Sequence, residues 1–124
     1  FIDCVFSLKN ITVHGNGKQL VDYLHKPDLM NLLKILVQIT PKTIYNVSSG
    51  NSKSIIDIAK IISKIGLEKF NQKIETSVMS NTKLPNSPKT APNKIMNDYN
   101  WSPTLDLESI ILKMMKIYPQ KFSN

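Results

Sequence analysis

The chain has 124 residues, of which 41% are hydrophobic, and its 16 lysines against 9 acidic residues give a formal net charge of +7. This length suffices for one domain with a core, and no apolar run approaches the ~20 residues that a membrane-spanning helix needs. A lone Cys4 and the lack of a secretory pattern predict one soluble, cytoplasmic domain without disulfide, cysteine metal cluster or membrane partner.

The first third of the chain predicts short strands followed by a helix. The apolar residues of Ile2–Phe6 indicate a first strand, before any turn signal. Ile11–Val13 and Gln19–Leu24 predict two further strands around Asn16-Gly17, a dipeptide that tolerates the positive φ of a tight hairpin turn. Pro27 marks the entry to a helix that begins at Asp28. Its predicted buried face consists of Leu29, Leu32, Leu33, Leu36 and Val37.

The middle of the chain predicts a strand, a helix and another strand. Thr43–Val47 is a β-branched and aromatic run, which favours a strand. Ser54 is the expected N-cap of the helix, Asp57 favours its first turn, and Gly66 is the expected C-cap. The alternation of Ile74–Met79 indicates the next strand. The predicted apolar face of this helix consists of Ile55, Ile58, Ala59, Ile62 and Ile65.

The last part predicts an irregular arm and a final helix. Asn81–Asn93 holds three prolines among Asn and Ser and reads as an exposed arm. After Pro103, either Thr104 or Asp106 can cap a helix that Pro119 stops. The expected face of that helix is Leu107, Ile110, Ile111, Met114 and Tyr118. The order β-β-α-β-α-β-α, with parallel strands joined through helices, predicts an α/β layer structure.

Three motifs in this order resemble a known enzyme family. They are GNGKQLVDYLHKPDL at Gly15–Leu29, YNVSSGNS at Tyr45–Ser52 and NWSP at Asn100–Pro103. The set resembles the C-terminal, substrate-binding third of NAD-dependent nucleotide-sugar epimerases and dehydratases, the extended short-chain dehydrogenases. The similarity covers residues 1–118. It implies that residues 1–124 form one small α/β substrate-binding subdomain of a Rossmann-type enzyme, an isomerase or lyase.

The resemblance places the catalytic machinery before Phe1. The family's NAD loop, its Tyr-x-x-x-Lys pair and its catalytic Ser or Thr would all precede that residue. We therefore expect a fragment, a processed product or a trimmed chain that lacks the N-terminal Rossmann domain. Such a chain has no catalytic or cofactor-binding residue of its own, and NAD would be bound by the missing domain. We expect the parent enzyme to be active and to be a homodimer, and this piece alone to be inactive.

The resemblance also implies a set of substrate-binding positions. Val21 stands where the family usually has an Arg that grips the donor's diphosphate, and Lys18 is at best a differently aimed substitute. Asp22 stands where an acid orients that Arg, and without it a capping or turn role is the alternative. Lys89 is the basic residue nearest to the position of a second phosphate-binding Arg. The candidate residues for binding a nucleotide-diphosphate sugar are Lys18, Gln19, Val21, Asp22, Asn46 and Lys89.

Other interpretations of these residues stay open. Gly15-Asn16-Gly17 could be a phosphate cradle, although a hairpin turn needs no more than this sequence. Asn46 and Ser48–Asn51 follow a predicted strand end, where they could face a ligand or bond the local backbone. His14 and His25 lack an acid partner at a spacing that would make them bases, and they predict no metal site.

Two alternative functions compete with the enzymatic one. Loss of both phosphate-gripping arginines favours a catalytically silent remnant or interaction module of the same fold. The net charge of +7 suggests a nucleic-acid-binding domain. However, the lysines are scattered along the chain, and the absence of arginine together with frequent Asn and Ile indicates a compositional bias instead.

Overall fold

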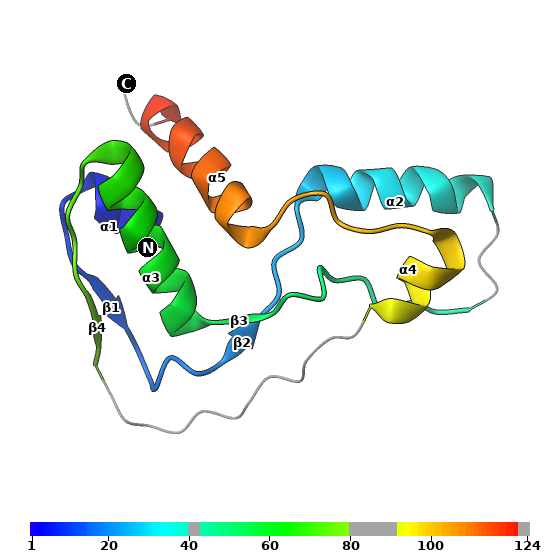
Figure 1. The fold of residues 1–124 in the computed structure, drawn as a ribbon, viewed down its shortest axis with the longest axis horizontal. Coiled ribbons are helices and arrows are strands. Elements are labelled where there is room, and N and C mark those ends of the chain that lie inside the picture. The colour runs from blue at the N-terminus through cyan, green and yellow to red at the C-terminus, as the bar shows by residue number, and fades with distance from the viewer. Residues whose placement is uncertain (40–42, 80–91, 122–124) are drawn as a thin grey trace.

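The structure, a computed structural model, describes residues 1–39, 43–79 and 92–121, the last three and Asn93 by their backbone only. The described part is α/β with short strands, as the sequence predicts (Figure 1). Its elements are α1 (Ile2–Phe6), β1 (Ile11–Val13), β2 (Leu20–Val21), α2 (Lys26–Gln38), β3 (Lys53–Ser54), α3 (Ile55–Phe70), β4 (Thr76–Val78), α4 (Asn93–Tyr99) and α5 (Leu107–Lys121).

The strands form two separate pairs. β1 and β4 are parallel, with Ile11 opposite Thr76 and Val13 opposite Val78. β2 and β3 are antiparallel, with Leu20 opposite Ser54. The predicted hairpin is therefore wrong: β1 and β2 both exist, but the turn between them leads each to a different partner. Pairing with strands beyond α2 outweighs the local turn preference of Asn16-Gly17, because each distant partner is attached to the buried helix α3.

Helix α3 lies at the centre of the larger apolar core, which we call the main cluster. Ser54 caps it as predicted, since its Oγ accepts a hydrogen bond from the Asp57 N–H. Gly66 does not end the helix, which continues to Phe70 and closes at Asn71 in the left-handed conformation. The glycine instead allows a close approach, because a Cβ there would lie 2.8 Å from Val5 Cγ1. The buried members of the main cluster are Val5, Ile11, Val13, Ile58, Ala59, Ile62, Ile65, Ile74, Leu107, Ile111 and Met115.

The N-terminal segment is helical, so the predicted first strand is wrong. Residues Ile2–Phe6 form α1, and Val5 is fully buried against α3. The ring of Phe6 packs edge-on against Phe70 and is stacked on Tyr118 of α5. An apolar run of this length fits either a strand or a short helix, and packing between α3 and α5 decides for the helix.

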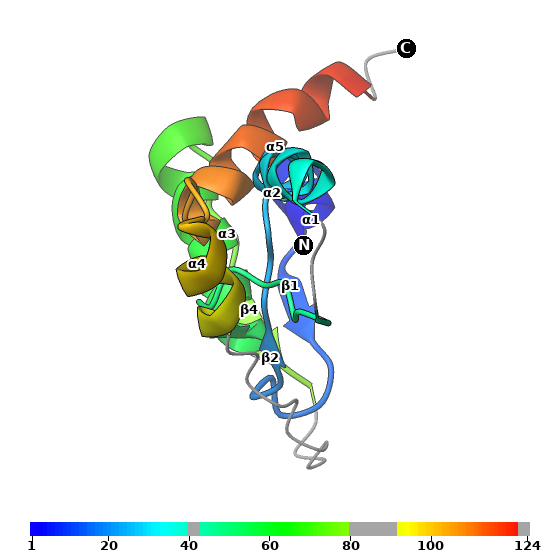
Figure 2. The same cartoon turned by 90° about the vertical axis from the view of Figure 1, so that its right-hand side faces the viewer.

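A second cluster lies at the other end of the molecule, around α2 and α4 (Figure 1). Its buried residues are Leu32, Ile95 and Trp101. Helix α2 is present as predicted but begins at Lys26, before Pro27, and not at Asp28. Its expected buried face is wrong in part, since Leu32 is buried but Leu33 is 42% exposed and Val37 is 87% exposed. Figure 2, turned by 90° from Figure 1, shows α5 and α2 in the upper part of the view and α4 below them.

One further prediction is wrong, and another lies mostly outside the described residues. Thr43–Val47 is not a strand, and Ile44 is 92% exposed. The arm predicted at Asn81–Asn93 lies outside the described residues except at its end, where α4 begins at Asn93 without a sequence signal that we recognised. Turn residues and prolines dominate this stretch, and they obscure the short, seven-residue helix that Ile95 anchors in the second cluster.

Helix α5 is largely as predicted. Asp106 is its cap, with its Oδ1 accepting a hydrogen bond from the Ser109 N–H at 2.8 Å. Leu107, Ile110 and Ile111 are buried, but Met115 is buried in place of Met114. The helix does not stop at Pro119 but continues to Lys121.

Candidate functional site

The glycine-rich segment Gly15–Gln19, which we call the glycine loop, is fixed against the start of α3. Gly15 and Gly17 have φ of 77° and 66°, which side chains rarely adopt. A Cβ on Gly17 would lie 3.0 Å from Ile56 Cβ and 3.1 Å from Val13 Cγ1. The glycines therefore serve a tight turn that packs directly on the helix.

Hydrogen bonds hold the same loop in place. The N–H groups of Ile55 and Ile56 each donate to a loop carbonyl at 3.0 Å, those of Gln19 and Gly17. The Lys18 N–H donates to Asn16 Oδ1 at 3.0 Å. Together with the cap at Ser54, these bonds occupy the first N–H groups of α3, so this helix start offers no phosphate cradle. The loop is therefore a turn that packs on α3 and not the turn of a β1–β2 hairpin.

The predicted substrate residues of this region lie along the loop and β2. Lys18 is exposed, and Gln19 is half-buried. Val21 is half-buried and packs against the main cluster. Directly opposite Val21 on β3 stands Lys53. This lysine was missed by the sequence analysis, because only the strand register brings it beside Val21.

Asp22 ties β2 to the segment that follows Tyr45. Its Oδ1 accepts a hydrogen bond from the Ser49 N–H at 2.6 Å, while its Oδ2 is buried without a partner among the described residues. Asp22 thus makes a long-range structural bond rather than the local capping or turn bond considered for it. Asn46 is exposed, and Ser48 is buried. Lys89 lies outside the described residues, and the structure does not test whether any of these residues binds substrate.

Asp28 makes a similar connection from α2 to the start of α5. The Thr104 hydroxyl donates to its Oδ1 at 2.6 Å, and Asp28 is only 1% exposed. Burial raises the pKa of this carboxyl, but the bonds from the Thr104 side chain and from the Thr104 and Leu105 N–H groups outweigh it, so the pKa is lowered. His25 Nδ1 lies 3.9 Å from the second carboxyl oxygen. Thr104, one of the two predicted caps of α5, is therefore used to anchor the chain instead.

The two anchored segments enclose a small pocket of about 220 Å³. Ser49 is fixed by Asp22, and Thr104 is fixed by Asp28, so both carboxylates hold walls of this space. The pocket is lined by Tyr23, Ser49, Asn51, Pro103, Thr104, Leu105, Asp106 and Leu107. Of these, Ser49 and Asn51 belong to the loop whose polar groups could face a ligand.

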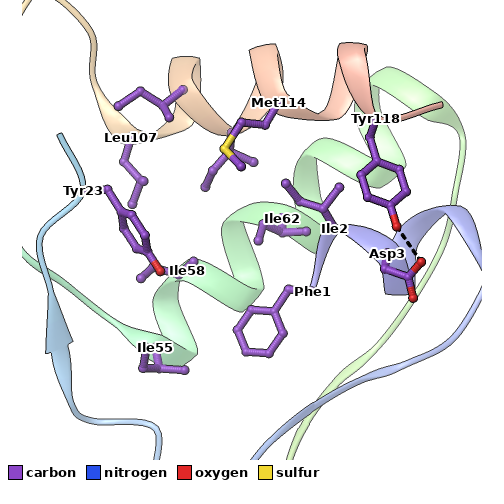
Figure 3. Close-up of a pocket in the computed structure, with 12 residues that line it drawn as sticks. Phe1, Ile2, Asp3, Tyr23, Ile55, Ile58, Ile62, Leu107, Met114 and Tyr118 are labelled. Atoms are coloured by element: carbon purple, nitrogen blue, oxygen red, sulfur yellow. Dashed lines mark hydrogen bonds between the residues drawn. The ribbon is translucent and has the colours of Figure 1, made fainter. Parts of the chain in front are cut away.

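A larger pocket, of about 440 Å³, lies between α1, α3 and α5 (Figure 3). Ile58 and Ile62 form one wall, and Leu107 and Met114 form the facing one. The Tyr118 hydroxyl donates to Asp3 Oδ1 at 2.6 Å at one end, which raises the pKa of the phenol. Tyr23 closes the opposite end. The lining is almost entirely apolar, and those predicted substrate residues that the structure describes line neither pocket.

Comparison with solved structures identifies the fold. The chain superposes on UDP-glucose 4-epimerase of Thermotoga maritima in complex with UDP-glucose, with a TM-score of 0.77, 12% identity and 98% of this chain covered. It matches dTDP-glucose 4,6-dehydratase of Bacillus anthracis in complex with NAD, with a TM-score of 0.73, 17% identity and 96% covered. It also matches UDP-glucuronic acid 4-epimerase of Bacillus cereus in complex with UDP-glucuronic acid and NAD, with a TM-score of 0.75, 20% identity and 98% covered. The chain shares its fold with part of these enzymes.

The chain spans 37–38% of the length of these three proteins. No protein-family model matches the sequence, and no curated protein matches it. Within the described residues, no group of three metal-ligating side chains occurs, and no helix is long and apolar enough to cross a membrane. The chain therefore has the fold of one part of these three proteins.

Proposed function

We propose that the chain is the substrate-binding, C-terminal portion of an NAD-dependent epimerase or dehydratase that acts on a nucleotide-diphosphate sugar. One observation carries this: 96–98% of the chain superposes on such enzymes at TM-scores of 0.73–0.77. The ordered motifs around the glycine loop, Tyr45 and Trp101 support the same family independently of the superposition.

Residues 1–124 form the substrate domain in this proposal, and a separate Rossmann domain binds NAD and supplies the catalytic residues. The role of this chain is to position the donor. The glycine loop, β2 and β3 form one side of the binding cleft, and the polar segment that includes Asn46 forms another, with Lys89 as a further phosphate contact. The parent enzyme is a cytoplasmic isomerase or lyase and a homodimer.

Calorimetric titration of the chain with UDP-, GDP-, CDP- and dTDP-sugars tests the proposal. We expect saturable binding of at least one donor and none of NAD, because the chain has no glycine loop that leaves free N–H groups at a helix start. Negligible binding of every donor, by the chain alone and after fusion to a Rossmann domain of the same fold, would contradict it.

A catalytically silent remnant is the second candidate. Val21, at the position where a diphosphate-gripping Arg is usual, is packed against the main cluster and so has a structural use of its own. If no donor binds and the chain still folds, this candidate replaces the first.

A further inference from the structure

We propose that Lys53 is the residue of this chain that holds the diphosphate of the nucleotide sugar. The proposal rests on the function proposed above. It goes further by assigning the phosphate-binding positive charge to β3, where the family resemblance places no phosphate-binding residue. It follows from the register of β2 and β3, from the surroundings of the Lys53 side chain and from the absence of a backbone alternative nearby.

The strand register places Lys53 next to Val21. The two residues are directly opposite each other in the antiparallel pair. Opposite residues project their side chains to the same face, with Cβ atoms ~4.5–5.5 Å apart. A lysine side chain is long enough to place its ammonium where an Arg on the neighbouring strand would place its guanidinium. Lys53 can thus supply, from the neighbouring strand, the positive charge that Val21 does not carry.

The surroundings of Lys53 leave its charge for a ligand. Its side chain is half-buried and makes no ion pair or hydrogen bond with any described residue. Two carboxylates lie close to these strands along the chain. Asp22, one residue after β2, accepts from the Ser49 N–H, and Asp57, three residues after β3, accepts from the Ser54 hydroxyl. A partly desolvated cation without a counterion attracts an anion.

Backbone groups do not provide an alternative at this place. The N–H groups of Ile55, Ile56 and Asp57 at the start of α3 already donate to the protein, and so does that of Lys18 in the glycine loop. An anion beside β2 and β3 therefore cannot use these four N–H groups without displacing a bond within the protein. The rigid attachment of the glycine loop to α3 fixes both strands, so the ammonium is offered from a preorganised surface.

The first experiment compares Lys53→Met with Lys60→Met, a matched change of an exposed lysine on α3. Methionine keeps the apolar stem, and circular dichroism verifies the fold of both variants. With UDP-glucose as the probe, we expect Lys53→Met to raise the Kd roughly tenfold or more, as the loss of one charge-assisted contact does, and Lys60→Met to leave it unchanged. Inorganic pyrophosphate should show the same loss, and the weak binding of uridine, which lacks phosphate, should not change.

The second experiment moves the cation across the strand pair. Val21→Arg added to Lys53→Met should recover the affinity of the parent chain for UDP-glucose, because the two positions serve one ligand group. The Lys53→Arg variant should bind UDP-glucose at least as tightly as the unmodified chain. If the unmodified chain binds donors and Lys53→Met binds them equally well, the assignment to Lys53 is overturned while the proposed function stands. If the unmodified chain binds neither UDP-glucose nor any other donor, both are overturned.

Discussion

The main cluster and the second cluster are built by different means. The main cluster draws buried residues from α1, β1, α3 and α5, with α3 as the central helix. The second cluster has three buried apolar residues, and much of α2 beside it remains exposed. It is connected instead by polar bonds between distant segments: Asp28 with Thr104, and Tyr45 with Asp98. One end of the molecule is thus held by apolar burial, and the other depends strongly on a few directed hydrogen bonds.

The largest difference between the two ends is expected when one apolar side chain is truncated at each of them. Ile11→Ala removes a fully buried side chain of the main cluster and should lower the free energy of unfolding by about 2–5 kcal/mol. Leu33→Ala on α2 removes a side chain that is 42% exposed and should cost less than about 1 kcal/mol. Urea denaturation followed by circular dichroism measures both. Equal losses would show that the two ends are held in the same way.

Removing a polar anchor should weaken the other end. Asp28→Asn is expected to lower the free energy of unfolding by about 1.5–3 kcal/mol, the range for a hydrogen bond to a charged group. The pKa of Asp28 is lowered in the folded chain, so its stabilisation is present above the unfolded pKa of about 3.9 and is lost as the pH falls through the lower folded value.

The stability of the parent chain should accordingly fall in acid, and that of Asp28→Asn should fall less steeply over the same range. Thr104→Val, which removes the donor and keeps the shape, serves as the control and should resemble Asp28→Asn at neutral pH. An acid dependence that is unchanged in Asp28→Asn would show that this carboxyl is not the anchor.

A smaller effect is expected where α1 meets α3. Gly66→Ala adds a methyl group that would lie 2.8 Å from Val5 Cγ1, and we expect a loss of about 1–2 kcal/mol although Ala favours helices. Val5→Ala in the same chain should make Gly66→Ala neutral or stabilising, since it removes the obstructing atoms. Thermal denaturation of the four chains measures the coupling. Simple additivity of the two changes would mean that α1 does not pack closely there.

The smallest effect concerns the surface of the second cluster. The Tyr45 hydroxyl donates to Asp98 Oδ2 at 2.8 Å, and bonds with Tyr99 and Asp98 raise the pKa of the phenol. Its contribution should therefore be intact at neutral pH and be lost only as the pH rises past the ordinary pKa of tyrosine. Ultraviolet difference titration should show late ionisation of both Tyr45 and Tyr118, and Asp98→Asn should shift only that of Tyr45 to lower pH. An unchanged titration in Asp98→Asn would refute the assignment.

The sequence was most informative where a local rule decides the outcome. Ser54 and Asp106 cap helices because each accepts a hydrogen bond from the N–H group only three residues later. The spacing of Ile58, Ala59 and Ile62 likewise predicts the buried face of α3. It was misleading where distant partners decide. Thr43–Val47 has strand residues but no strand partner among the described residues, and Ile2–Phe6 is helical because α3 and α5 enclose it.

The candidate site also has one part that the local sequence predicts and one part that depends on distant pairing. The glycine loop can be located from its residues, since positive φ requires glycine. Lys53, the cross-strand neighbour of Val21, cannot be located from the sequence, because the register between β2 and β3 is a property of the folded chain. A shift of the register by one residue would turn Lys53 to the other face.

The parallel pairing of β1 with β4 has a consequence for how the chain folds. The two strands can meet only after β2, α2, β3 and α3 have been traversed, so the entropy of closing a long loop opposes their contact. Helix α3 forms through contacts between residues close in sequence, and α1 and β1 can pack against it earlier. We therefore expect the β1–β4 ladder to be completed late during folding, and expression conditions that slow this step will leave the edge of β1 available for pairing between chains.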